Sequence, residues 1–213
     1  MESIERLTKR EYMKLFHQSD WKLFKIGANY YLRIAALLKM NDIELTDEEQ
    51  SAVYCKDNRL LFRNIQKRLS IGIGSELLIK AHFINSGYLI NKPLSKNFKG
   101  TLHKIGSIPE IEININETFS FDKLIHALPK LEKERIKDQK HRVHPEITEG
   151  LKIAKVFRNK EAHVITNSHD YNELDYSKIE KCIIKLYKEW FNEEVNFNIS
   201  FEKNEIGKFE IKK

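Results

Sequence analysis

The chain is poor in cysteine, glycine and proline, and each scarcity excludes a class of protein. Its 213 residues include two cysteines, Cys55 and Cys182, which lie far apart in predicted helices. This usage excludes a disulfide-stapled secreted scaffold and favours a reduced, cytoplasmic protein. Eight glycines and four prolines are too few for a turn-rich β-sandwich or barrel, and they favour long helices instead.

Long hydrophobic runs are also missing. The longest apolar stretch, residues 30–40, is interrupted by Arg33 and Lys39 and is too short to cross a bilayer. The N-terminal residues contain no basic segment followed by an apolar core, so the sequence predicts no secretory signal. We therefore expect a cytoplasmic protein without a membrane partner.

The chain does contain enough apolar and charged residues for a folded, basic protein. Apolar residues make up 41% of the sequence and charged residues 32%, so the chain can bury a core. Its net charge is +6 and its isoelectric point is near 9.1. A basic balance of this size makes a polyanionic partner such as a nucleic acid plausible, although basic surfaces also serve solubility.

Apolar residues recur at helical spacing in five segments, so the sequence predicts a mainly helical protein. In the first helix the recurring residues are Leu23, Ile26, Tyr30, Ile34 and Leu37 or Leu38. The spacing does not decide whether the second segment is one helix or two. The predicted helical segments are residues 20–40, 48–84, 118–128, 148–166 and 174–193.

Other segments break the helical pattern. Residues 88–118 contain two prolines and two glycines and are expected to form an ordered insertion. Within it Glu110 and Glu112 alternate with isoleucines, which predicts that they lie on the solvent-exposed face of an edge strand. Residues 194–213 alternate apolar and polar side chains about an Asn-Glu-Ile-Gly turn, which predicts a β-hairpin. Residues 1–18 carry a weaker pattern that favours a short leading helix.

Residues 130–144 form a dense run of charges of both signs. Such a run is most simply a solvated segment, and contact with RNA is the alternative, with Arg142 as a candidate contact. His141 and His144 are three residues apart, but no further ligands that would complete a closed metal site are evident. We therefore expect no metal at this segment.

The segment from Gly72 to Lys80 contains two features that invite a functional interpretation. Gly72 and Gly74 resemble a fragment of a phosphate-binding loop, but no predicted strand precedes them and no Gly-Lys-Ser or Gly-Lys-Thr follows. Glu76 lies early in an otherwise apolar helix, where a carboxylate needs solvent or a cation. Lys80, four residues on, is the simplest partner, and Arg158 or a cation of another helix is the alternative.

One short motif places three polar residues on the predicted helix at residues 148–166. It comprises Arg158, Asn159 and His163. Arginine holds phosphate through a planar fork of donors, and histidine transfers protons near neutral pH. Asn159 and His163 are four residues apart and share a helix face. Arg158 directly precedes Asn159, so it lies on a neighbouring face of the helix. These groups can cleave RNA without a metal, because RNA carries its own nucleophile, the 2′-hydroxyl. The alternative is that they form only the polar face of a surface helix.

The motif and its setting resemble the HEPN superfamily, the helical domains named for higher eukaryotes and prokaryotes nucleotide binding. Arg158-Asn159-x3-His163 is similar to the R-x4–6-H signature of that superfamily, and the run from Ser75 to Ala81 is similar to its acidic apolar helix. The resemblance covers roughly residues 15 to 193 and explains neither the insertion nor the hairpin.

The resemblance implies a fold that is mainly all-α. The expected architecture is an antiparallel up-and-down HEPN-like helical bundle in residues 1–193, with an insertion at about residues 88–118. A small C-terminal β-hairpin appendage at residues 194–213 follows it.

The resemblance also implies a function. Many members are metal-independent endoribonucleases of toxin–antitoxin, abortive-infection and CRISPR-associated defence systems, so we expect an RNA-cleaving toxin or antiphage-defence effector without a cofactor. The implied partners are RNA, a second copy of the chain in a homodimer with a shared cleft, and an antitoxin or larger defence complex. The alternative is a non-catalytic HEPN-like module that binds RNA, a nucleotide or a protein.

The resemblance assigns roles to individual residues. Arg158 and His163 are implied as catalytic, with Asn159 as an orienting residue and Glu76 as an acidic support. The expected RNA contacts are Lys155, Lys160 and Arg142.

Overall fold

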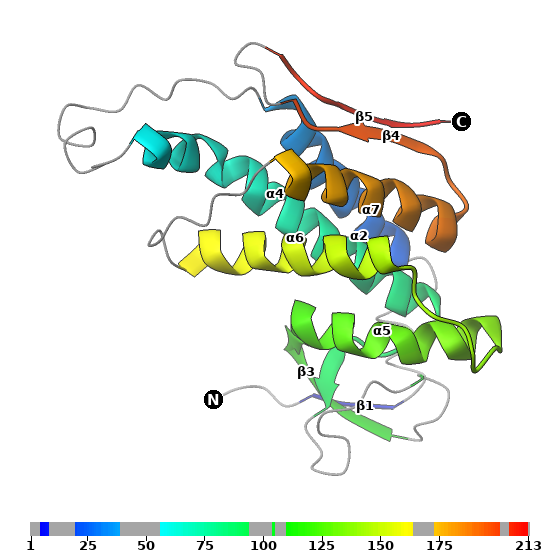
Figure 1. The fold of residues 1–213 in the computed structure, drawn as a ribbon. Helices are drawn as coiled ribbons and strands as arrows, with labels where there is room; N and C mark the ends of the chain where they lie inside the picture. The colour runs from blue at the N-terminus through cyan, green and yellow to red at the C-terminus, as the bar shows by residue number, and fades with distance from the viewer. Residues whose placement is uncertain are drawn as a thin grey trace. The chain divides into compact units, whose positions relative to one another are not determined.

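A computed structural model describes most of the chain, and it is mainly helical (Figure 1). It describes residues 5–8, 20–38, 56–93, 104, 110–163, 173–200 and 205–212. The helices are α2 (Asp20–Leu37), α4 (Lys56–Asn85), α5 (Phe121–Ile136), α6 (Pro145–His163) and α7 (Glu173–Phe191). The mainly helical fold class is thereby confirmed. Among the described residues, no helix is long and apolar enough to cross a membrane.

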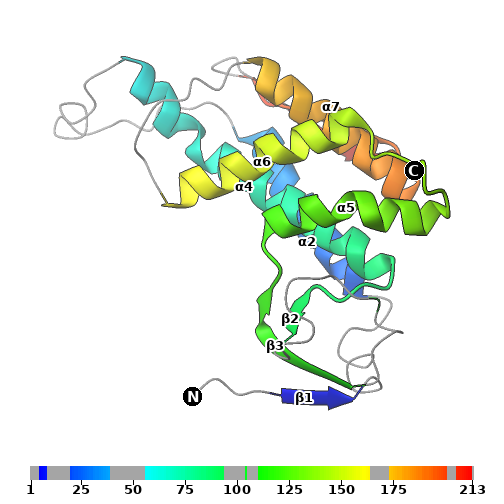
Figure 2. The ribbon, with the colours of Figure 1, turned by 60° about the horizontal axis from the view of Figure 1, so that its bottom comes forward.

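The strands form two small antiparallel sheets. The first contains β1 (Glu5–Thr8), β2 (Asn91–Pro93) and β3 (Glu110–Thr118) in the order β1-β3-β2, and Figure 2 shows β3 between its two neighbours. The second pairs β4 (Val195–Asn198) with β5 (Lys208–Ile211). This pairing confirms the predicted C-terminal hairpin.

Two predictions about the first sheet were wrong. Residues 5–8 form a strand, where a leading helix was expected for residues 1–18; the remainder of that segment lies outside the described residues. Glu110 and Glu112 lie on the central strand, because β1 pairs along one side of β3 and β2 along the other. The edge-strand interpretation failed because β1, which pairs with Glu110 and Glu112, comes from the distant N-terminal part of the chain.

The chain divides into two compact units. The sheet unit contains residues 1–27 and 76–143, and the hairpin unit contains residues 28–75 and 144–213. Helices α2 and α4 are therefore each divided between the two units, with one end in each. The sheet unit holds α5 and the three-stranded sheet, and the hairpin unit holds α6, α7 and the β4–β5 pair.

In the hairpin unit α6 and α7 pack as an antiparallel pair. Lys185 of α7 lies 3.2 Å from Glu146 at the start of α6, and the rings of Phe157 and Tyr176 lie 5.3 Å apart at the other end. Between these contacts Gly150 lies against Cys182, so closely that a Cβ on Gly150 would be 2.2 Å from that of Cys182. The glycine thus lets the two helices approach closely at Cys182.

Helix α4 is one continuous helix of 30 residues, which settles the question that the sequence left open for residues 56–84. Gly72 and Gly74 lie inside it, and no phosphate-binding loop forms there. A Cβ on Gly74 would lie 2.9 Å from Cγ of Leu32 in α2. These glycines therefore mark positions where other helices approach α4.

Helix α2 lies as predicted, but most of the residues that predicted it face solvent. Leu23, Ile26 and Tyr30 are 66%, 62% and 61% exposed. The residues that α2 buries in the hairpin unit are Ala28, Leu32, Ala35 and Ala36. Helix α2 therefore carries two apolar faces, and the one made mostly of small side chains is the one that packs in the hairpin unit.

The C-terminal hairpin packs on the helices of its unit. The Phe209 ring lies 6.0 Å from that of Tyr187 in α7, and the Gly207 amide donates to the Ala36 carbonyl of α2 at 2.8 Å. The end of β4 is held by two helices, because Lys67 of α4 donates to the Ser200 carbonyl at 3.0 Å and Glu180 of α7 accepts from the Ile199 amide at 2.6 Å. These two hydrogen bonds thus fix the end of β4 to α4 and α7.

In the sheet unit α5 continues into the charged run, which was expected to be a solvated segment. Ser120 caps the helix by accepting from the Lys123 amide, and Lys137 ends it in the left-handed conformation with φ 59°. Leu131 and Glu132, inside the run, are both buried. The prediction failed for the helical part because these two side chains face the interior of the unit, while the residues after Lys137 are largely exposed as expected.

Candidate functional site on helix α6

Helix α6 begins and is oriented by local interactions. Pro145 occupies its first position, where a missing amide hydrogen costs nothing. The His144 ring accepts from the Glu146 amide through Nδ1 at 3.3 Å, which satisfies one of the donors at the helix start. Glu146 also adds a negative charge near the positive end of the helix dipole.

The buried face of α6 fixes which residues point outward. Ile147, Leu151, Ala154 and Phe157 lie in the core of the hairpin unit. Lys178 of α7 further pairs with Glu149 at 2.6 Å. Because α6 is held along this face, Asn159 near its C-terminal end is exposed.

Arg158 lies where α6 meets α4. A Cβ on Gly72 would lie 2.6 Å from the Arg158 Cβ and 2.8 Å from its backbone nitrogen. No side chain fits between the two backbones at this point, so Gly72 sets how closely Arg158 approaches α4. The Arg158 side chain is nevertheless partly exposed.

Arg158 and Asn159 contact each other directly. Nη1 of Arg158 donates to Oδ1 of Asn159 at 3.3 Å. This hydrogen bond orients the amide and holds the planar guanidinium near the surface of the hairpin unit. The structure therefore brings together two of the three motif residues that the sequence singled out.

His163 is the last residue of α6. Its side chain, like that of Lys160, lies outside the described residues. The backbone of α6 is helical from Asn159 to His163, so the two positions share a face one turn apart. Lys155, one turn before Asn159 on that face, is partly exposed.

The remaining predicted residues lie in the sheet unit. Glu76 is buried and pairs with Lys80 at 2.8 Å, so the simplest partner that the sequence offered is present. Arg142 is exposed in the segment between α5 and α6.

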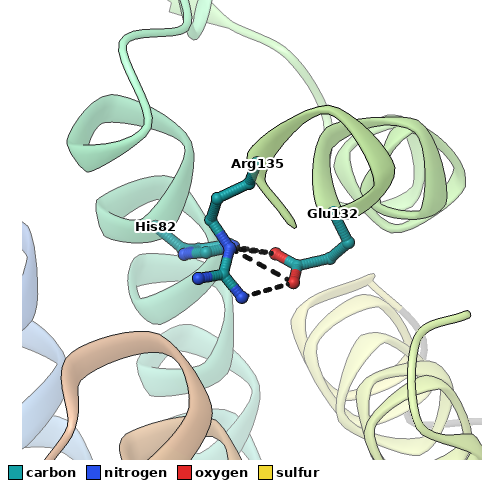
Figure 3. Close-up of polar contacts among 3 residues, drawn as sticks. All are labelled: His82, Glu132 and Arg135. Atoms are coloured by element: carbon teal, nitrogen blue, oxygen red, sulfur yellow. Dashed lines mark hydrogen bonds and ion pairs between the residues drawn. The ribbon is translucent and has the colours of Figure 1, made fainter. Parts of the chain in front are cut away.

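The sheet unit contains a buried ionic cluster that sequence reasoning missed (Figure 3). His82 of α4 is 1% exposed and Glu132 of α5 is 2% exposed, and Nε2 of His82 lies 2.5 Å from Oε1 of Glu132. Arg135 donates to the same carboxylate, through Nη2 at 2.7 Å and through Nε at 3.2 Å. The only sequence signal was a histidine within an apolar helix and a carboxylate within a charge run.

Burial and hydrogen bonding set the charges of this cluster. Burial alone would raise the pKa of Glu132, but hydrogen bonds from His82 and Arg135 outweigh it and hold that pKa at about 2. Burial lowers the pKa of His82, against the effect of the neighbouring carboxylate. The pair is therefore a neutral imidazole beside an ionised Glu132, and it ties α4 to α5. Both groups are too deeply buried to meet a substrate.

A second unusual group is Lys67, which is 2% exposed in the hairpin unit. Burial lowers its pKa to about 8, because the charged ammonium is poorly solvated there. Among the described residues, no group of three or more His, Cys, Asp or Glu side chains has an arrangement that could hold a metal ion.

Comparisons of this chain with protein families, with curated proteins and with solved structures each find no match.

Proposed function

We propose that this protein is a metal-independent endoribonuclease of the HEPN type, acting as a toxin or antiphage-defence effector. The observation that carries the proposal is the hydrogen bond from Arg158 to the exposed Asn159 on α6, one turn before His163. A guanidinium, an amide and an imidazole on one helix end supply the groups that RNA cleavage needs. The net charge of +6 favours the approach of a polyanion.

The proposed reaction uses the RNA's own 2′-hydroxyl. His163 accepts the 2′-proton, the 2′-oxygen bonds to phosphorus, and the bond from phosphorus to the 5′-oxygen breaks. The leaving 5′-oxygen takes a proton from a second acid, for which a symmetric dimer would provide the partner's histidine. The products are a 2′,3′-cyclic phosphate and a 5′-hydroxyl. Arg158 stabilises the negative charge that builds on the phosphate oxygens, and Asn159 orients its guanidinium.

The experiment measures cleavage of labelled RNA in EDTA by the wild type and by single variants. His163→Ala should lower the rate by about 10²- to 10⁴-fold, the usual contribution of a positioned acid–base group. Arg158→Ala should lower it by about 10²-fold or more. Alanine keeps the Cβ that touches Gly72, so this variant removes the guanidinium without opening the helix contact.

Matched controls separate the site from general loss of charge. Arg33→Ala removes an exposed arginine of α2, and His126→Ala removes a histidine of α5 whose side chain is 76% exposed. Both should cleave like the wild type. Undiminished cleavage by His163→Ala and Arg158→Ala would remove the assigned site.

The close contact of Arg158 with Gly72 favours a second candidate, a non-catalytic module in which Arg158 serves chiefly to pack α6 on α4. Such a module binds RNA, a nucleotide or a protein without cleaving. Stoichiometric RNA binding by the wild type with no cleavage, unchanged in His163→Ala, would favour it.

A further inference from the structure

The charge run at residues 130–144 contains six lysine or arginine residues and three acidic residues. The structure buries one of the acids, Glu132, and leaves Asp138 exposed among the cations. The cations Lys137, Lys140 and Arg142 are all exposed, and we call these three residues the basic turn.

Each of the three carboxylates is engaged by a defined contact. Glu132 points into the unit and is bound by His82 and Arg135 (Figure 3). Glu134 accepts a hydrogen bond from the Tyr88 hydroxyl and pairs with Lys104 at 3.1 Å. Glu132 and Glu134 thus pair with Arg135 and Lys104, cations outside the basic turn, and offset its charge less.

Asp138, the third carboxylate, shapes the turn itself. Its Oδ1 accepts from the Lys140 amide at 2.8 Å, and its carbonyl accepts from the His141 amide at 3.1 Å. Its own amide donates to the Lys133 carbonyl at 3.2 Å, which closes the end of α5. The backbone that carries the three cations is therefore fixed by hydrogen bonds, so less conformational entropy is lost when they bind.

We propose that the basic turn is a docking surface for the phosphate backbone of RNA, a role that rests on RNA being the substrate class of the proposed function. Lys137, Lys140 and Arg142 supply three cations against one exposed carboxylate, Asp138, within six residues. His141 between them offers a planar ring on which an unpaired base can stack. Contacts of this kind position the RNA without reading its sequence.

Three cations suit a nucleic acid better than a lipid surface. Recognition of anionic membranes by basic segments uses clusters of about four to eight cations, commonly beside an apolar helix face or a lipid anchor. The basic turn contains three and has no apolar side chain between Lys137 and Arg142. We therefore assign it to RNA and treat membrane binding as an outcome to be tested.

The test measures binding of a labelled single-stranded RNA as a function of salt, by fluorescence anisotropy. All proteins carry His163→Ala, so that cleavage does not interfere. Lys140→Gln/Arg142→Gln should weaken binding about tenfold, and the slope of log affinity against log salt should fall by about 1.4, or 0.7 for each lost contact to a single strand. Adding Lys137→Asn, which suits the left-handed conformation, should lower it by a further 0.7 or so.

The matched control is Lys181→Gln/Lys188→Gln, which removes the same charge from two exposed lysines of α7. It should leave the salt slope unchanged, and Lys140→Arg/Arg142→Lys should retain binding. Equal losses in both double variants, an unchanged slope in Lys140→Gln/Arg142→Gln, or binding to phosphatidylserine vesicles with RNA binding unaffected would overturn the proposal.

These outcomes are independent of cleavage. Slope loss in the basic-turn variant, together with no cleavage by the wild type, would support the docking surface and remove the proposed nuclease. Cleavage that depends on His163, together with an unchanged slope, would keep the nuclease and remove the docking surface.

Discussion

Gly72 of α4 and Arg158 of α6 touch through their backbones, with room for no Cβ on the glycine. A glycine inside a helix costs about 1 kcal/mol relative to alanine. Here the cost is offset because the missing side chain lets α6 approach α4. The position of Arg158 therefore depends on a residue that is distant in the sequence and carries no chemistry of its own.

Gly72→Ala should destabilise the protein by about 1–3 kcal/mol, although alanine is the better helix former. The added Cβ would lie 2.8 Å from the Arg158 nitrogen, and backbone cannot move aside as easily as a side-chain end. Urea unfolding measures the effect. Gly27→Ala is the matched control, because its Cβ meets only a side-chain carbon of Leu77 at 3.3 Å. A loss in Gly27→Ala as large as that in Gly72→Ala would contradict this explanation.

Glu132 should make stability depend on pH in the acid range. Its pKa is about 2 in the folded protein against an ordinary 4.5, so the folded state binds fewer protons than the unfolded one between these values. Its contribution is therefore present above about pH 4.5 and is lost as the pH falls toward 2. The full contribution is on the order of 3 kcal/mol. His82, whose pKa is also lowered, acts in the same direction below pH 6.5.

Urea midpoints measured between pH 7 and pH 3 check this prediction. The wild type should lose stability toward low pH, and Glu132→Gln should lose less over the same range, although it starts from a lower value. Glu117→Gln, which removes an exposed carboxylate paired with Lys92, should run parallel to the wild type. Parallel curves for the wild type and Glu132→Gln would refute the role of the cluster.

Lys67→Met should stabilise the protein at pH 7. The pKa of Lys67 is lowered to about 8 from 10.5, so below pH 8 the folded state carries a buried ammonium that burial disfavours. Stability of the wild type should then rise as the pH increases from 8 to 10.5, because the unfolded state keeps the proton that the folded state has lost. The gain from methionine is at most on the order of 3 kcal/mol, less about 1 kcal/mol for the bond to the Ser200 carbonyl.

The free energy of unfolding of Lys67→Met and of the wild type, measured at pH 7 and at pH 10, tests this prediction. The advantage of the variant should be larger at pH 7 and should shrink at pH 10. Lys181→Met, at an exposed position of α7, should show no such pH dependence. A stability advantage of Lys67→Met that grows with pH would mean that interactions in the folded protein offset the cost of burying the Lys67 ammonium.

Lys137→Gly should stabilise the sheet unit by about 1 kcal/mol. Lys137 has φ 59°, a conformation that costs a side-chain-bearing residue about 1–2 kcal/mol and costs glycine little. The net gain is reduced because glycine also adds freedom to the unfolded chain. Lys140→Gly, at a position without positive φ, should be neutral or destabilising in the same thermal or urea unfolding assay. A stabilised Lys140→Gly together with an unchanged Lys137→Gly would contradict the backbone argument.

The helices that carry one strong apolar face were predictable from the sequence. In α7 the regularly spaced Ile179, Ile183 and Leu186 are all buried, so the periodic residues and the core residues coincide. Helix α2 shows why this can fail. Its large apolar residues and its small ones both recur at helical spacing, and spacing alone does not decide which set meets the core.

The candidate site likewise contains contacts that the sequence could predict and contacts that it could not. Arg158 and Asn159 are neighbours in the chain, so their hydrogen bond is local and the motif could be recognised without a structure. The contact of Arg158 with Gly72 joins distant parts of the chain, and so does that of Glu132 with His82. Residue type does not reveal such pairs, because a glycine or a carboxylate suits many environments.

The sequence by itself determined the mainly helical fold class, the C-terminal hairpin and the Arg158-Asn159-x3-His163 motif, since these depend on residues close together in the chain. Tertiary structure alone decided that Gly72 and Gly74 are points of helix approach, that β3 is a central strand, and that the charge run buries Glu132 while exposing Lys140 and Arg142. Local propensity acts over a few residues, whereas burial and charge pairing depend on which distant segment lies opposite.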